Sequence, residues 1–201
     1  MIRPVTIRMS IIALGLCASL LAPSAASTQT DSVSAYTSTG TKACSVAKGE
    51  SDTRICPGVA GLVVVVSEDD LRETVSVGRN RAAAMKEPAA QAWFSPFSST
   101  TPTIEWRAAS GQPPHAIIQR WHLADGRDIG GDGSPRTKAL LIVTRLPPGT
   151  VCHVAYIDVA ANPNANELAR TAADTVARDF VCGKDKVQVI GAPGRAVELA
   201  H

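Results

Sequence analysis

The chain has 201 residues, of which 45% are hydrophobic, 19% charged and 4% aromatic. This length and balance predict one globular domain, and they exclude a disordered chain, a collagen-like repeat, a coiled coil and a multi-pass membrane protein. Lysine and arginine number 20 against 18 acidic residues, so the chain lacks the strong positive charge of a nucleic-acid-binding protein and we expect no nucleic-acid partner.

The N-terminal segment is typical of a secretory signal. Arg3 and Arg8 precede an apolar run over residues 11–22, and small residues follow, among them Ser24 and Ala26. A basic start, a short apolar run and small residues before the cut are the parts of an export signal. A membrane anchor is the alternative, but it needs about 20 apolar residues. We therefore predict cleavage after Ala26 and a periplasmic or secreted protein whose mature chain has equal numbers of basic and acidic residues.

Four cysteines remain after cleavage, namely Cys44, Cys56, Cys152 and Cys182. An even number of cysteines in an exported chain predicts two disulfides, for which three pairings are possible. We favour Cys44–Cys56 and Cys152–Cys182, because each pair encloses one local unit that folds back on itself. Zinc binding by the four thiols is the alternative, but no CxxC spacing starts such a site.

The first half of the domain begins with a predicted hairpin. Residues 61–67 (GLVVVVS) form a β-branched run, residues 68–70 are an acidic break, and alternation resumes over residues 74–77. This pattern is typical of two paired strands with a polar turn. Residues 79–87 could form two helical turns, which Pro88 would end.

A second hairpin is predicted from residues 103–107 (TIEWR) and 115–123 (HAIIQRWHL). The intervening Gly and Pro residues indicate a turn. The register that we expect places Glu105 opposite Arg120, as a cross-strand ion pair. Residues 124–137 contain four glycines and one proline, so we expect a loop there.

A third hairpin and the main helix follow. Residues 138–145 and 150–159 alternate around an LPPG turn. Asn164 with Glu167 three residues later is typical of a capping box, and apolar residues then recur at helical spacing. We therefore predict a helix over residues 164–182, with charged residues along its other face.

Together these elements predict an α+β fold, in which successive hairpins form an antiparallel sheet and one main C-terminal helix packs on one face. Two disulfides staple it. The expected organisation is a signal peptide over residues 1–26, a flexible leader over 27–35, a single α+β domain over 36–190 and a loose C-terminal tail over 191–201. Within the domain, residues 187–189 are expected to form a short edge strand.

Five residues are candidates for binding. Trp93, Phe94 and Phe97 gather in a Pro- and Ser-rich loop, and aromatic side chains anchor binding sites because they bury much area at little entropic cost. Alternatively, this loop closes over an open edge of the core. Arg107 and Arg120 could bind an anionic ligand, or they could belong to a solvated face of the sheet.

The sequence predicts no catalytic residue, cofactor or metal site. There is no G-x-S-x-G motif, and the internal histidines His115, His122 and His153 lie in no recognisable motif. Because His115 and His122 are seven residues apart on one expected strand, they should point to opposite faces. The glycine-rich stretch at 125–133 resembles a calcium loop, but it lacks the acidic residue that would complete one.

Three stretches resemble a group of small exported proteins of Gram-negative bacteria to which no activity is assigned. They are TIEWR, IIQRWHLADG and the block CHVAYIDVAANPNANELARTAADTVARDFVCG, which ends at Gly183. The resemblance implies a periplasmic setting and transfers no site residue. We therefore expect a non-catalytic binding or inhibitory module of the cell envelope, with an envelope or periplasmic protein as its partner. The alternatives are a small periplasmic hydrolase or other enzyme with an unrecognised site, and a structural envelope component.

Overall fold

The computed structural model describes residues 31–46, 49 and 52–201. The predicted signal peptide and its cleavage site lie outside these residues. The strands are β1 (Ser32–Ser38), β2 (Ser45–Val46), β3 (Thr53–Pro57), β4 (Val63–Asp69), β5 (Arg72–Gly78), β6 (Ser98–Ala109), β7 (Pro114–Ile129), β8 (Pro135–Arg145), β9 (His153–Asp158) and β10 (Gln188–Val189). The helices are α1 (Arg81–Ala84), α2 (Ala165–Thr175) and α3 (Arg195–Leu199), with 3-10 turns η1 (Thr41–Ala43) and η2 (Pro88–Gln91).

The strands form one mixed sheet. Its order is β10-β9-β8-β7-β6-β5-β4-β3-β2, and β1 pairs with β6. The three predicted hairpins are confirmed as β4–β5, β6–β7 and β8–β9. Two neighbouring pairs are parallel instead: β10 with β9, and β5 with β6, which meet at the single pair Arg72 and Ser98. The fold is therefore α+β only in a broad sense, because strands dominate it and the sheet is not purely antiparallel.

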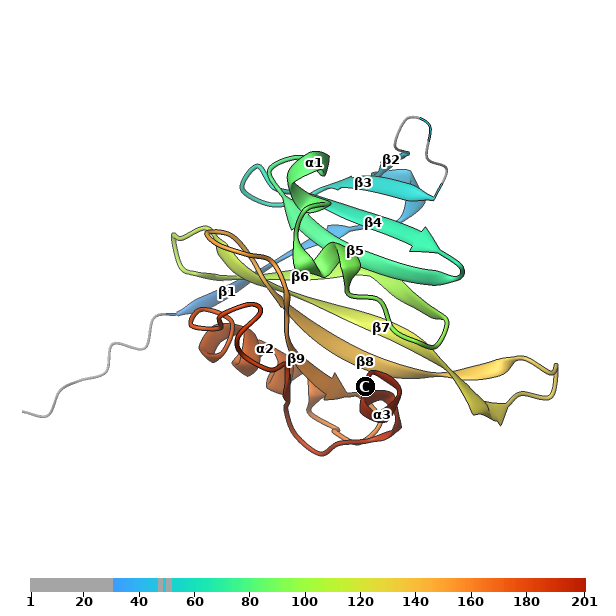
Figure 1. Cartoon of the computed structure of the whole chain (residues 1–201). Helices are drawn as coiled ribbons and strands as arrows, with labels where there is room; N and C mark the ends of the chain where they lie inside the picture. The colour runs from blue at the N-terminus through green and yellow to red at the C-terminus, as the bar shows by residue number, and fades with distance from the viewer. Residues whose placement is uncertain (1–30, 47–48, 50–51) are drawn as a thin grey trace, which may run out of the picture.

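The sheet folds into layers with a core on each side of the long strands. Figure 1 shows β3, β4 and β5 above β6–β8, and α2 below them. Successive side chains of strand β7 point to opposite faces of the sheet, so this strand contributes to both cores. Ile117, Trp121 and Leu123 belong to the core shared with β4 and β5, whereas Ala116 and Ile118 belong to the core under α2.

Both predicted disulfides are present. Cys44 is bonded to Cys56, and Cys152 to Cys182. The first joins the segment before β2 to β3. The second joins the start of the last long strand to the segment that follows α2, so it fastens the helical layer to the sheet.

Helix α2 forms where it was predicted, but it is shorter. It ends at Thr175, and the Asn164 side chain makes no capping hydrogen bond. The chain continues in turns, and Ala177 and Phe180 still enter the core under the helix. These buried residues extend the apolar periodicity past the end of the helix, which explains why the sequence pattern predicted a helix up to residue 182.

The predicted flexible leader, residues 27–35, contains most of β1. This strand pairs with β6 from Ser32 to Ser38. Two distant partners hold it: the Trp106 indole nitrogen donates to Thr37 Oγ1 at 2.8 Å, and Ser34 Oγ donates to Glu105 at 2.6 Å. A serine-rich segment is thus held as a strand, because its hydroxyls form hydrogen bonds with buried and charged groups elsewhere in the chain.

The predicted loop at residues 124–137 is also mostly strand. Strand β7 continues to Ile129 and β8 begins at Pro135, so that only the tip is irregular. The Lys138 ammonium pairs with the Asp128 carboxylate along this arm. Glycines that suggested a loop therefore occupy the turn of a long hairpin, whose arm projects from the body in Figure 1.

The predicted loose tail, residues 191–201, forms α3 and packs on the sheet. Ala196 and Val197 are buried in the core shared with β4 and β5. The Arg195 guanidinium donates to both carboxylate oxygens of Asp125, at 2.9 and 2.8 Å, and this pairing holds the pKa of Asp125 below its usual range. A bidentate pair and two buried side chains fix a segment whose sequence has little periodicity of its own.

The predicted pairing of Glu105 with Arg120 is wrong. Glu105 lies opposite Ile118, two residues from Arg120 along β7, in the register that holds from Ile104 to Arg107. Glu105 instead pairs with Arg170 of α2 at 2.7 Å. Its charge therefore links the sheet to the helix.

Candidate functional site

The aromatic loop at residues 93–97 connects η2 with β6 and is anchored by one buried ring. Phe94 is 4% exposed. Its ring centroid lies 5.3 Å from that of Trp121 and 5.8 Å from that of Tyr156. Phe94 therefore closes the core, as the alternative interpretation of this loop expected, and it is not available to a partner.

The other two aromatic residues of the loop face solvent. Trp93 is 59% exposed and Phe97 is 45% exposed. Leu71, in the turn between β4 and β5, is also 59% exposed, and its carbonyl accepts from the backbone nitrogen of Ser98, which directly follows Phe97. Three large apolar side chains thus gather at one end of the β4–β5 hairpin, and we call Leu71, Trp93 and Phe97 the apolar patch.

The turn that presents Leu71 is strained. Asp70 and Leu71 have φ angles of 47° and 61°, in the left-handed region that glycine or asparagine favours at such hairpin turns. A leucine in this conformation costs about 1 kcal/mol or more. Strain of this kind is more often found at binding sites than at ordinary turns.

Arg72 lies at the centre of the apolar patch. Its Nε and Nη2 donate to the Ser95 carbonyl at 3.0 and 2.9 Å, and Nη1 donates to the carbonyl and carboxylate of Asp70. The centre of the guanidinium lies 4.9 Å from the Phe97 ring centroid and 6.0 Å from that of Trp93. One cation therefore fixes the backbone of the loop and contacts both exposed rings.

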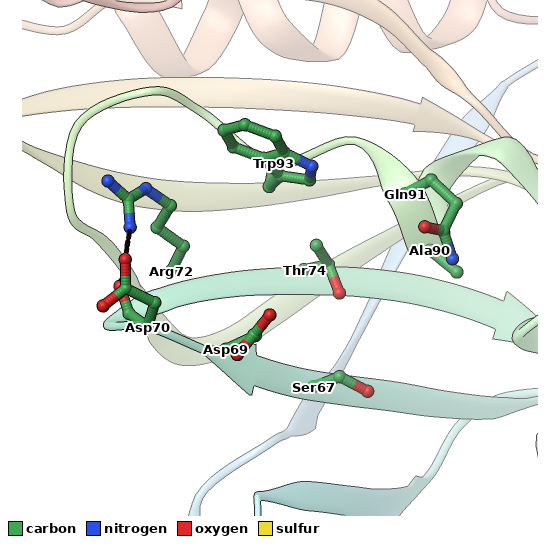
Figure 2. A pocket seen from close by; sticks show the side chains of 8 residues that line it. All are labelled: Ser67, Asp69, Asp70, Arg72, Thr74, Ala90, Gln91 and Trp93. Atoms are coloured by element: carbon green, nitrogen blue, oxygen red, sulfur yellow. Dashed lines mark hydrogen bonds and ion pairs between the residues drawn. The ribbon is translucent and has the colours of Figure 1, made fainter.

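A groove of about 480 Å³ opens beside Trp93. Figure 2 shows Trp93 on one side of it, with the side chains of Asp69 and Thr74 on the strands opposite and Gln91 at one end. The lining residues are Ser67, Asp69, Asp70, Arg72, Thr74, Ala90, Gln91 and Trp93. This volume is within the range of pockets that bind small ligands or side chains.

Arg107 does not belong to this site. It is 7% exposed, and its Nε lies 3.2 Å from Asp174 of α2, whose carboxylate it also contacts through Nη2. Nη1 reaches Ser34 and lies 3.8 Å from Glu105. Its guanidinium is thus occupied between the sheet and α2, where it has a structural role.

Arg120 lies apart from the aromatic loop as well. It lines a smaller hollow of about 250 Å³ on the helix side of the sheet, with Tyr36, Asn166 and Arg170 among its neighbours. The five predicted binding residues therefore separate into three groups: Trp93 and Phe97 on the surface, Phe94 beneath them, and the two arginines on the side of α2.

The three internal histidines do not converge. His153 is buried, its Nδ1 lies 3.1 Å from the Tyr156 hydroxyl, and burial lowers the pKa of the imidazole to about 4. His115 lies 3.5 Å from Asp174, and its pKa is lowered by burial and by Arg178. Within the described part of the chain, no group of three His, Cys, Asp or Glu residues could hold a metal ion.

No protein-family model, curated protein sequence or solved structure matches the chain. The resemblance to exported proteins of Gram-negative bacteria therefore stays a prediction. Among the described residues, no helix is long and apolar enough to cross a membrane.

Apart from Trp93 and Phe97, the residues of the site were not predicted from the sequence, among them Asp69, Arg72, Thr74 and Gln91. Arg72 could have been noticed, because an arginine directly after a hairpin turn is placed to cover neighbouring loops. That it would reach the loop twenty-three residues later depends on the single β5–β6 contact. No local pattern in the sequence predicts the contact between β5 and β6.

Proposed function

We propose that this protein is a non-catalytic binding module of the cell envelope, which contacts a protein partner through the apolar patch and the adjoining groove. The observation that carries the proposal is the set of contacts that Arg72 makes with the aromatic loop. A charged side chain that is bonded to the loop backbone holds Trp93 and Phe97 in the solvent. Exposed apolar residues gathered in one place are typical of interaction sites.

The rigidity of the patch supports this proposal. Phe94 fixes the loop from the core side and Arg72 fixes it from the surface side. Tryptophan and arginine are the residues that contribute most often to binding energy, and a pre-ordered loop reduces the entropy lost on binding. An export route is supported by the two disulfides, which form in oxidising compartments.

The test is affinity capture with crosslinking from the native envelope, using the tagged protein and two variants. We expect a Trp93→Ala/Phe97→Ala double variant to lose a partner that the unchanged protein retains, while its melting temperature stays the same. The matched control is Ile129→Ala, because Ile129 is 51% exposed but lies on the distant β7–β8 arm. Equal recovery of the same partner by the double variant would contradict the proposal.

A third variant separates binding from stability. Leu71→Gly removes a side chain of the patch and relieves the strained φ angle of 61°. We expect the free energy of unfolding to stay within about 1 kcal/mol or to rise, because relief of strain offsets the entropy of glycine. Binding should nevertheless weaken.

A further inference from the structure

We infer that the groove beside Trp93 receives an arginine side chain of the partner protein. The inference rests on the proposed function, because it assigns the chemistry of one contact within that surface. It is drawn from the charge of the groove, the indole at its wall and the acceptor groups opposite.

The groove has a negative charge that the protein itself does not neutralise. Asp70 is paired with Arg72. Asp69 also lies opposite Arg72 across the hairpin, but the guanidinium turns to Asp70 and to the Ser95 carbonyl. Among the described residues no ion pair forms at Asp69, whose side chain is exposed at the groove. A cationic group of the partner would therefore meet a complementary charge.

The remaining lining groups suit a donor-rich and planar cation. Thr74 presents a hydroxyl and Gln91 presents a carboxamide, so oxygen acceptors lie on a strand and at one end (Figure 2), whereas the Ser67 hydroxyl already bonds Thr53 and Met85. Trp93 supplies an aromatic wall, over which a cation is attracted. Guanidinium fits this set better than ammonium does, because its fork of N–H donors binds carboxylates bidentately and its plane stacks on aromatic rings.

The molecule already contains one example of the same recognition. Arg72 contacts the Trp93 and Phe97 rings while it donates to a carboxylate and a backbone carbonyl. A partner arginine at Asp69 would repeat this arrangement on the groove side of Trp93. The pairing of Arg72 with Asp70 limits the repulsion between the two guanidinium groups.

The test is a titration of the isotope-labelled protein, followed by backbone amide chemical shifts. The probe is the peptide acetyl-Gly-Arg-Gly-amide. The matched probes carry lysine, or citrulline, which has the shape of arginine without its charge. We expect shifts at residues 67–74 and 90–93, with affinity falling from arginine to lysine and then to citrulline.

Asp69→Asn should weaken binding of the arginine peptide about tenfold or more, since it removes a charged hydrogen-bond acceptor while keeping the size of the side chain. The control variant is Asp179→Asn, an exposed carboxylate that does not line the groove. Equal affinities for arginine and citrulline, or an unchanged affinity in Asp69→Asn, would overturn the inference. The envelope capture with the Trp93→Ala/Phe97→Ala variant separately tests the proposed function, so that a failure of the inference and a failure of the proposed function can be told apart.

Discussion

The two faces of the long strands are packed in opposite ways. Toward β4 and β5, the core contains the largest fully buried side chains, with Trp106 and Trp121 both 1% exposed. Toward α2, the contact consists mainly of small residues, for which Ala169 and Ala173, both fully buried, are typical. The first face depends on buried area, whereas the second brings a helix close to the sheet with little area per residue.

At the face toward α2, which we call the helix face, ion pairs and a disulfide compensate for the small buried area. Arg107 pairs with Asp174, Arg170 pairs with Glu105, and the disulfide of Cys152 fastens the segment after the helix. The pairing with Glu105 raises the pKa of Arg170. The same kind of residue therefore has different roles on the two sides: arginine joins layers near α2, whereas Arg72 holds the loop that exposes Trp93 and Phe97.

The largest expected effect on stability is at the face toward β4 and β5, which we call the aromatic face. Trp121→Ala removes a fully buried indole that contacts Phe94 and His153, so it should lower the free energy of unfolding by about 3–5 kcal/mol. Urea denaturation measures this change. A loss below about 1 kcal/mol would mean that buried area does not dominate this face.

On the helix face the disulfide should come next. Cys152→Ser/Cys182→Ser opens a loop with a sequence separation of 30 residues, for which chain entropy predicts a loss of about 3.7 kcal/mol. Cys44→Ser/Cys56→Ser opens a separation of only 12 residues, for which about 2.9 kcal/mol is expected. Chemical denaturation of both double variants tests the order, and a larger loss at the shorter loop would refute it.

The buried imidazole of His153 should make the aromatic face sensitive to acid. Its pKa is about 4 in the folded protein, against 6.5 for a free histidine. Between these values the unfolded chain binds more protons, so stability is complete above pH 6.5 and is lost as the pH falls toward 4, by about 3 kcal/mol. His115 and His122 also have lowered pKa values and act in the same direction. The measurement is therefore the slope of the free energy of unfolding against pH, compared between the unchanged protein and His153→Gln. Equal slopes in the two proteins would contradict the prediction.

The smallest effect should be at the ion pair of the helix face. Asp174→Asn leaves Arg107, whose side chain is 9% exposed, without its main carboxylate. We expect a loss of about 2 kcal/mol, because a buried charge that loses its partner keeps its desolvation cost. Asp179→Asn on the same segment should change stability by less than about 0.5 kcal/mol. Equal effects in the two variants would show that charge does not hold this face.

The local patterns of the sequence predicted the structural features that depend on residues close together along the chain. The valine run at residues 63–66 pairs with β5 as the β-branched run and the acidic break after it indicated, and both disulfides enclose the local units that suggested them. Strand β1 and helix α3 could not be predicted in this way. Each is fixed by partners that are distant along the chain, as Ser34 is by Glu105 and Arg195 by Asp125.

The same limit applies to the candidate site. The cluster of Trp93, Phe94 and Phe97 was visible in the sequence, but the division into one buried and two exposed rings was not, since it depends on where Trp121 lies. The predicted role of Arg107 rested on its place in a strand. Its burial against Asp174 follows from the packing of α2, which residue spacing alone does not determine.

The position of α3 has a consequence for the order in which the protein is made. Asp158, at the end of β9, accepts a hydrogen bond from the backbone nitrogen of Ala196 at 2.8 Å, and Gly194 packs directly against that carboxylate. The residues that complete the core are thus synthesised after all the long strands that they cover. Until they arrive, the side chains that Ala196 and Val197 cover stay open to water, so the chain is exposed to aggregation and proteolysis after its long strands have been made and before α3 has docked.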